Sequence, residues 1–325
     1  MGYGNYSHAA HQALIADRAA LSGTEVFGQR NCHALMNPHG LKIRESRDGD
    51  DHPQSLAIAF ALDVTGSMGM IPELLARQEL PSFMKLLGDC RIADPQVLFM
   101  AIGDATSDSA PLQIGQFETT AELMDQWLTW SFLEGGGGGG GSESYELAFY
   151  VLAQHTDIDC WVKRRKRGYL FLTGDERPYP AVSRHQIDAL LGEKLDEDIP
   201  IDEVIAAAAE TYHLFFLIPD LERRGHCERR WRELLGDQVI CMESHVDTCS
   251  VAAAIVGLTE GTLSDVDAVA TVLAANGTPR ERIAATIRAL QPYADLLDPE
   301  AAKRVNRALP PAASHRPAWW KRLFA

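Results

Sequence analysis

The chain has 325 residues and a formal net charge of −15. Its 46% apolar and 23% charged residues are typical of a globular protein and exclude a disordered, fibrous or collagen-like chain. The acidity argues against nucleic acid as the main ligand, because neutralising phosphates requires a basic face. No apolar run approaches the roughly 18 to 20 residues that cross a bilayer, and residues 1–10 lack a secretion signal. We therefore expect a cytoplasmic protein without a membrane partner.

The sequence pattern divides the chain into four parts. Residues 1–54 are a polar lead-in segment, 55–260 alternate apolar runs with helical spacing, 261–309 are a helical extension, and 310–325 are a tail rich in Pro and Trp. Apolar runs predict buried strands at 56–63, 96–103, 168–174, 212–219 and 238–242. Alternating apolar and polar residues predict a short edge strand at 112–117, and we expect a helix at 229–235 before the last strand. This alternation predicts an α/β fold: a Rossmann-like, doubly wound, mostly parallel sheet with one short edge strand and helices on both faces.

Acidic residues follow three of the predicted strands. Asp63 ends the first strand, Asp104 follows the second, and Asp175 follows the third. The carboxyl ends of parallel strands meet at one edge of a sheet, where ligands gather. Thr65 and Ser67 add two hydroxyls in the turn after Asp63. Carboxylate and hydroxyl oxygens without sulfur or imidazole suit a hard cation, most simply Mg²⁺, with Mn²⁺ or Ca²⁺ as alternatives.

Structural roles compete with metal binding at two of these acids. Asp63 could close an Asx turn or cap the following helix. We favour metal binding, because the cap would leave Asp175 and the two hydroxyls unexplained. Asp104 is equally consistent with a turn residue after Gly103 and with a residue that supports the ligands from behind.

Three short motifs resemble those of the von Willebrand factor A domain with its metal-ion-dependent adhesion site. They are DVTGSM at 63–68, GGGGGGGSES at 135–144 and TGDE at 173–176, and the resemblance spans about residues 56–257. It implies metal ligation by Asp63, Thr65, Ser67 and Asp175.

The family's second-loop threonine is absent here. Ser142 takes its place by counting back from the next helix, and Ser144 is the second choice. Asp104, Glu143, Ser144 and Glu176 are candidates for residues that support the ligands. The seven glycines at 135–141 lack the Lys-Ser/Thr ending of a P-loop, so a flexible loop approaching the metal is favoured over a phosphate cradle.

A cation held by hydroxyls and one or two carboxylates keeps a vacant coordination position. We expect a Glu or Asp of a partner protein to fill it, so that the domain acts as an adaptor and not as an enzyme. The resemblance to intracellular bacterial members of the family implies a MoxR-type AAA ATPase as a partner. His155 and His213 lie on apolar patterns that favour core histidines over catalytic ones.

Two other functions stay open. A metal-dependent hydrolase or phosphatase would use Asp63 as nucleophile or ligand and Asp175 as ligand, although Thr65 stands where a HAD-type phosphatase has its second acid. A purely structural scaffold would have an empty site.

Three further features have simpler explanations. Six scattered cysteines predict reduced thiols, and a zinc site at Cys241, His245 and Cys249 is disfavoured because Cys241 ends an apolar run. The basic run at 163–167 predicts a solvated loop before a strand. The terminal WWKRLF, with Trp319, Trp320 and Phe324, could dock on another protein, fold back onto its own domain, or anchor weakly at a membrane surface.

Overall fold

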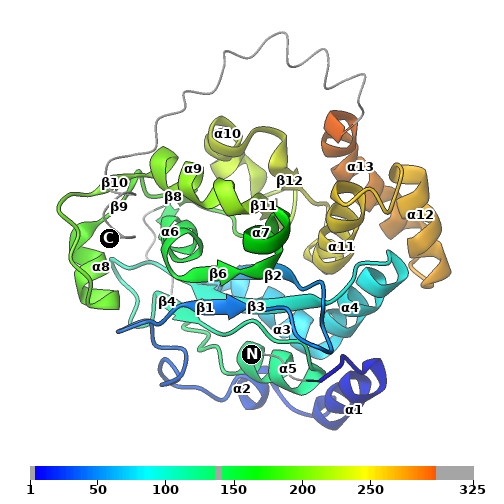
Figure 1. Cartoon of the computed structure of the whole chain (residues 1–325), viewed down its shortest axis with the longest axis horizontal. Coiled ribbons are helices and arrows are strands. Elements are labelled where there is room, and N and C mark those ends of the chain that lie inside the picture. The colour runs from blue at the N-terminus through cyan, green and yellow to red at the C-terminus, as the bar shows by residue number, and fades with distance from the viewer. Residues whose placement is uncertain (1–3, 136–140, 298–325) are drawn as a thin grey trace.

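The computed structural model describes residues 4–135 and 141–297. Within them, a central six-stranded sheet has the order β12-β11-β7-β2-β3-β4 and carries helices on both faces (Figure 1). Its neighbouring strands pair in parallel except for the short edge strand β4, which is antiparallel to β3. The predicted doubly wound α/β fold is confirmed. The strands are β2 (Leu56–Asp63), β3 (Pro95–Ile102), β4 (Leu112–Ile114), β7 (Gly168–Thr173), β11 (Tyr212–Ile218) and β12 (Val239–Cys241).

Strand β2 is apolar almost throughout because its alternate side chains enter two different cores. Ile58 and Phe60 enter one core, while Ala57 and Ala59 leave room on the other face for larger side chains of the helices there. The first core is covered by α4 (Leu80–Asp89), α5 (Ala121–Thr129), α11 (Thr248–Thr259), α12 (Val266–Ala275) and α13 (Arg280–Leu297). The second is covered by α6 (Glu146–Gln154), α8 (Arg184–Leu191), α9 (Ile201–Thr211) and α10 (Arg224–Leu235).

Between β2 and β3 the chain forms four short helical pieces in place of one regular helix. They are the 3-10 turn η1 (Gly66–Gly69), α3 (Met70–Leu74), the π-helix η2 (Leu75–Glu79) and α4. The N–H of Leu80 bonds to the carbonyl oxygen of Leu75, one residue further back than in an α-helix. Pro81 follows at once and has no N–H to donate. The wider turn thus lies where a regular hydrogen-bond ladder would be broken in any case.

The N-terminal segment is anchored to the sheet domain by strand pairing and by ion pairs. It contains α1 (His8–Arg18), α2 (Gly23–Val26) and β1 (Arg44–Ser46), which pairs in parallel with β6 (Thr156–Ile158). Both Nη atoms of Arg18 donate to the carboxylate of Asp125 on α5, each at 2.5 Å. This ion pair fixes α1 against α5.

The helices α12 and α13 pack beside α11 at one end of the molecule (Figure 1). The hydroxyls of Thr259 and Tyr293 lie 2.8 Å apart, and Arg282 donates to Asp247 at 2.7 Å. Trp319, Trp320 and Phe324 lie outside the described residues. In the described part of the chain, no helix combines the length and apolarity needed to cross a membrane.

Some local structure differs from the sequence predictions. Helix α10 begins at Arg224 and not at 229, and its polar first turns are held by ion pairs of Arg224 and Arg232 with Glu228. The basic run is not a simple solvated loop, because α7 (Asp159–Arg164) includes its first two residues. Lys163 pairs with Asp159 at 2.7 Å and Arg164 with Asp48 at 2.6 Å. Three short strand pairs were not predicted. They are parallel β1 with β6, parallel β5 (Ser142–Glu143) with β8 (Arg177–Pro178), and antiparallel β9 (Ala181–Val182) with β10 (Ile199–Pro200).

Candidate functional site

The candidate site lies where the order of the strands reverses. From β2 the chain continues to β3 on one side, and later returns to add β7 on the other side of β2. Such a reversal opens a crevice at the carboxyl ends of the strands, where ligands of doubly wound sheets bind. Asp63 ends β2, and Asp175 follows β7 after one glycine.

Asp63 is fully buried, and both of its carboxylate oxygens are hydrogen bonded. Oδ1 accepts from the backbone N–H of Thr65 at 2.9 Å and from its hydroxyl at 2.6 Å, while Oδ2 accepts from the hydroxyl of Tyr145 at 2.5 Å. The Asx turn expected as the simpler explanation is therefore present. It does not account for the bond from Tyr145, which directly precedes α6.

Gly174 allows this approach of Tyr145. A Cβ atom at Gly174 would collide with the hydroxyl end of the Tyr145 ring. The TGD motif after β7 thus has a packing reason for its glycine, in addition to placing Asp175.

Glu143 is the acid that lies closest to Thr65 in the second loop. It lies near the Thr65 side chain, and its surroundings include Asp63, Asp104 and Asp108. Only 5% of the residue is exposed, and its Oε2 atom has no hydrogen-bond partner among the described residues. A buried carboxylate oxygen without a donor costs free energy unless it is protonated or meets a cation.

The pKa values of both carboxyl groups are shifted upward. Burial raises the pKa of Asp63 to about 7, against the opposing effect of the bonds from Thr65 and Tyr145. Burial, together with the negative charges of Asp63, Asp104 and Asp108, raises the pKa of Glu143 to about 8. Both groups thus favour a proton or another positive charge close by.

Asp175 follows β7, lies near enough to Asp63 to raise its pKa, and is paired with a cationic side chain. Its Oδ2 atom accepts from Nη1 of Arg223, which also lies 3.5 Å from the sulfur of Met68 in the turn after β2. Nε of Arg223 pairs with Asp220 at 2.9 Å. The loop after β11 therefore supplies a positive charge at the rim of the acidic cluster.

Asp104 and Ser144 have mainly structural contacts. Asp104 accepts from the N–H and hydroxyl of Thr106 and from the hydroxyl of Tyr179 at 3.1 Å, as expected of a turn residue. The hydroxyl of Ser144 accepts from the N–H of Ala105 at 2.9 Å. Together these bonds hold the loop after β3 against the start of α6.

Glu143 is better placed than its neighbour Ser142 to be the metal ligand of the second loop. Successive side chains of a strand point to opposite faces, so Ser142 points away from Thr65 if Glu143 points toward it. Metal binding by Ser142 stays a prediction. The same holds for Ser67, whose side chain is not among those that the structure describes. Most of the glycine run, 136–140, also lies outside them.

The part of the chain that the structure describes contains no group of three or more His, Cys, Asp or Glu side chains arranged to hold a metal ion. The zinc alternative at Cys241, His245 and Cys249 thus gains no support. A site built partly from hydroxyls is a different donor set. The chemistry present fits a hard cation: an unpaired oxygen of Glu143, the Thr65 hydroxyl, and Asp63, gathered with more negative than positive charge.

Comparisons with known proteins identify structural likeness only. No family model and no curated protein matches the sequence. Similar solved structures include a von Willebrand factor type A protein from Catenulispora acidiphila (11% identity, TM-score 0.41, 70% of this chain and 49% of that chain). The pilus adhesin SpaC of Lactobacillus rhamnosus GG has 9% identity and a TM-score of 0.42 over 70% of this chain and 31% of that chain.

A third similar structure is the proximal thread matrix protein 1 of the mussel byssus, with 10% identity and a TM-score of 0.40 over 66% of this chain and 48% of that chain. The present chain thus spans between 31% and 49% of the length of these proteins. Likeness at this level assigns neither a family nor a function.

Proposed function

We propose that this chain is a protein-binding domain of the von Willebrand factor A type, and that it captures an acidic side chain of its partner through a divalent cation. Asp63, Thr65 and Glu143 would hold the cation, with Asp175 nearby after β7. When bound, the cation supplies a coordination position that an incoming carboxylate can fill. The observation that carries this proposal is the buried, unpaired oxygen of Glu143 beside Thr65 and Asp63.

The residues of the chain have distinct tasks in this proposal. Tyr145 fixes the orientation of Asp63, and the Asx turn fixes Thr65 relative to the same carboxylate. Arg223 at the rim provides a second positive group that can pair with an incoming acid. Mg²⁺ is the first choice of ion, because it is commonly bound by one or two carboxylates and keeps several exchangeable positions. The partnership with a MoxR-type AAA ATPase depends on the sequence resemblance and stays a prediction.

Titration calorimetry with Mg²⁺ and Mn²⁺ tests the proposal. The wild type should bind one ion, and Asp63→Asn and Glu143→Gln should each abolish measurable binding while the circular dichroism spectrum stays native. Asp188→Asn, an exposed position on α8, is the matched control and should bind like the wild type. Equal binding by all four proteins would refute the proposed ligands.

A second arm separates binding from hydrolysis. A tripeptide with a central Glu and blocked termini should bind the metal-loaded protein, and the matching Gln peptide should not. If the metal-loaded wild type hydrolyses p-nitrophenyl phosphate and Asp63→Asn does not, the protein is a phosphatase and the binding proposal is wrong. If the wild type binds no metal ion, the structural scaffold with an empty site is the remaining explanation.

A further inference from the structure

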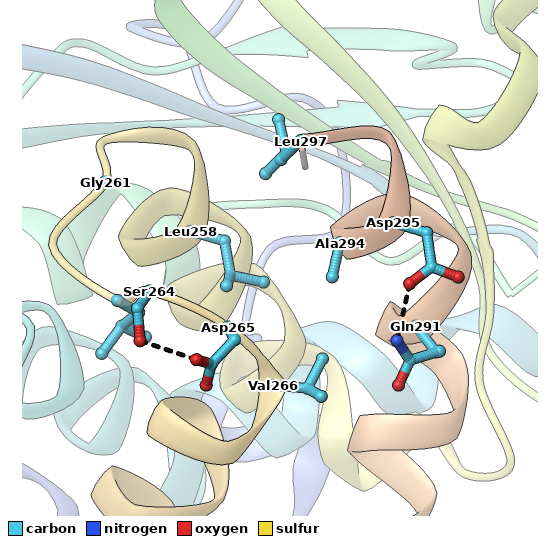
Figure 2. Close-up of a pocket in the computed structure, with 10 residues that line it drawn as sticks. Leu258, Gly261, Ser264, Asp265, Val266, Gln291, Ala294, Asp295 and Leu297 are labelled. Atoms are coloured by element: carbon cyan, nitrogen blue, oxygen red, sulfur yellow. Dashed lines mark hydrogen bonds between the residues drawn. The ribbon is translucent and has the colours of Figure 1, made fainter. Parts of the chain in front are cut away.

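A cavity of about 430 Å³ opens between the last helices of the described chain. It is lined by the end of α11, the turn that leads into α12, and the last turns of α13. Figure 2 shows Ser264 and Asp265 on one side of it and Gln291, Ala294 and Asp295 on the other. Its volume lies in the range of about 300 to 1,000 Å³ that is typical of ligand pockets.

The lining combines apolar and acidic groups. Leu258 and Leu263 are nearly buried, while Leu297 remains 40% exposed at the point where the described chain ends. Apolar surface of this kind is favourably covered by another apolar group.

The two acids of the cavity have only neutral partners in the described chain. Asp265 accepts from the N–H of Ala268 and the hydroxyl of Ser264, and Asp295 accepts from the amide of Gln291 at 2.7 Å. No salt bridge to either carboxylate is present within residues 4–135 and 141–297. The cavity therefore offers negative charge next to an apolar surface.

The sequence after Leu297 has the complementary chemistry. Residues 298–325 contain six Lys or Arg and two acids, in a chain whose formal net charge is −15. Their last part combines Trp319 and Trp320 with Lys321 and Arg322. A tryptophan buries roughly 150 to 250 Å² when it is covered, and an adjacent cation can pair with a carboxylate at the rim.

The connecting length is also sufficient. Trp319 comes 22 residues after Leu297, which itself lines the cavity. A flexible linker of that length has an end-to-end distance of roughly 25 Å, and such tethering gives effective concentrations of about a millimolar. Weak contacts are then enough to populate the docked state.

We propose that residues 317–325 fold back and dock in this cavity, with the Trp319–Trp320 pair on the apolar lining and Lys321 and Arg322 on the carboxylates of Asp265 and Asp295. This inference is independent of the metal site. It selects one of the three roles that the sequence leaves open for the WWKRLF segment.

Hydrogen exchange of the full chain, read by mass spectrometry, tests the proposal. In the Trp319→Ala/Trp320→Ala variant, the segments 258–266 and 290–297 should exchange about tenfold faster than in the wild type, because the tethered cover is lost. Segment 56–63 of the central strand should be unchanged, which verifies that the variant is folded. Equal exchange of wild type and variant in the two cavity segments would overturn the proposal.

A charge reversal provides a second test that does not remove the rings. Asp295→Lys should accelerate exchange at 258–266, and adding Lys321→Glu/Arg322→Glu should restore most of the protection. Asp265 is unsuitable for this change because its side chain caps α12. Asp267→Lys, exposed on α12 and outside the cavity lining, is the matched control and should leave exchange as in the wild type. Failure of the restoring changes would contradict the assigned ion pairs.

A membrane anchor would give a different result. If vesicles with 30% phosphatidylserine retain the wild type but not the Trp319→Ala/Trp320→Ala variant, while both exchange equally at the cavity, the segment is a membrane anchor and the proposal is wrong. Protection of the cavity segments in the purified protein, with no other macromolecule present, supports docking on the chain itself.

Discussion

The hydroxyl of Tyr145 donates to Oδ2 of Asp63 at 2.5 Å and joins the start of α6 to the end of β2. This bond joins the first motif of the proposed site, at 63–68, to its second loop, and Gly174 in the third loop leaves room for the Tyr145 ring. Three turns that are far apart in sequence thus determine the position of one buried carboxylate. A substitution in any of these turns should therefore change the affinity of Asp63 for a cation.

Tyr145→Phe should weaken Mg²⁺ binding by about 10 to 100-fold, the usual effect of removing a partner that orients a metal ligand. It should also destabilise the metal-free protein by about 1 to 3 kcal/mol at pH 8, where Asp63 is left with one donor fewer. Calorimetry and urea denaturation measure the two effects. Tyr150→Phe, which loses a bond to Glu193 at 2.9 Å, is the control and should retain metal affinity. If Tyr145→Phe binds Mg²⁺ with unchanged affinity, the hydrogen bond from Tyr145 to Asp63 does not support metal binding.

Glu146→Gln should remove a pH-dependent loss of stability. Burial raises the pKa of Glu146 to about 8, whereas the unfolded chain releases this proton near 4.5. Between these two pH values the native state binds more protons than the unfolded state, so the free energy of unfolding of the wild type falls as the pH rises. From pH 5.5 to 8.5 the variant should gain on the order of 3 kcal/mol relative to the wild type. Urea denaturation at both pH values measures this gain, and the exposed Glu122→Gln control should follow the wild type. An equal difference at both pH values would contradict the burial argument.

Arg223→Met should strengthen divalent cation binding. The guanidinium is paired with Asp175 and adds positive charge where the cation would bind. Removing one unit charge at a few ångströms near a protein surface is worth roughly 1 to 2 kcal/mol, or about a tenfold gain in affinity. Calorimetry with Mg²⁺ measures it. Arg224→Met, which breaks only the exposed pair with Glu228, should show no gain. A loss of affinity in Arg223→Met would show that the arginine supports the site instead of competing with the ion.

Asp125→Asn should destabilise the protein by about 3 to 5 kcal/mol, because it leaves the nearly buried guanidinium of Arg18 without its charge partner. Thermal and urea unfolding would both show this loss. Glu233→Gln breaks only exposed pairs on α10 and should cost less than about 1 kcal/mol. If both variants unfold alike, the N-terminal helix is not anchored by this pair.

Strand positions and sheet class were predictable because they depend on local apolar periodicity. Strand β2 occupies the predicted residues 56–63, and the ends of β3 and β7 shift by one residue from the predicted boundaries. The two-residue strands β5 and β8 were not predictable, because so short a segment has no periodicity. The early start of α10 depends on ion pairs of Glu228 and not on an apolar stripe.

The site was predictable in its acids and not in its contacts. Asp63 and Asp175 follow strands whose ends must meet, so their proximity follows from the fold. The role of Tyr145 depends on a hydrogen bond over 82 residues of sequence, for which the chain contains no local signal. The prominence of Glu143 depends on the short pairing of β5 with β8, which determines the side to which residues 142 and 143 point.

The most direct test of the proposed cation site is the water proton relaxation rate of Mn²⁺ titrated with the protein. The wild type should show one saturable site, and a Glu-containing tripeptide should lower the relaxation enhancement by displacing a bound water, whereas Thr65→Ala should show no saturable site. Enhancement that is equal in wild type and Thr65→Ala, or that the acidic tripeptide leaves unchanged, would contradict a cation at this edge with a position open to a partner's carboxylate.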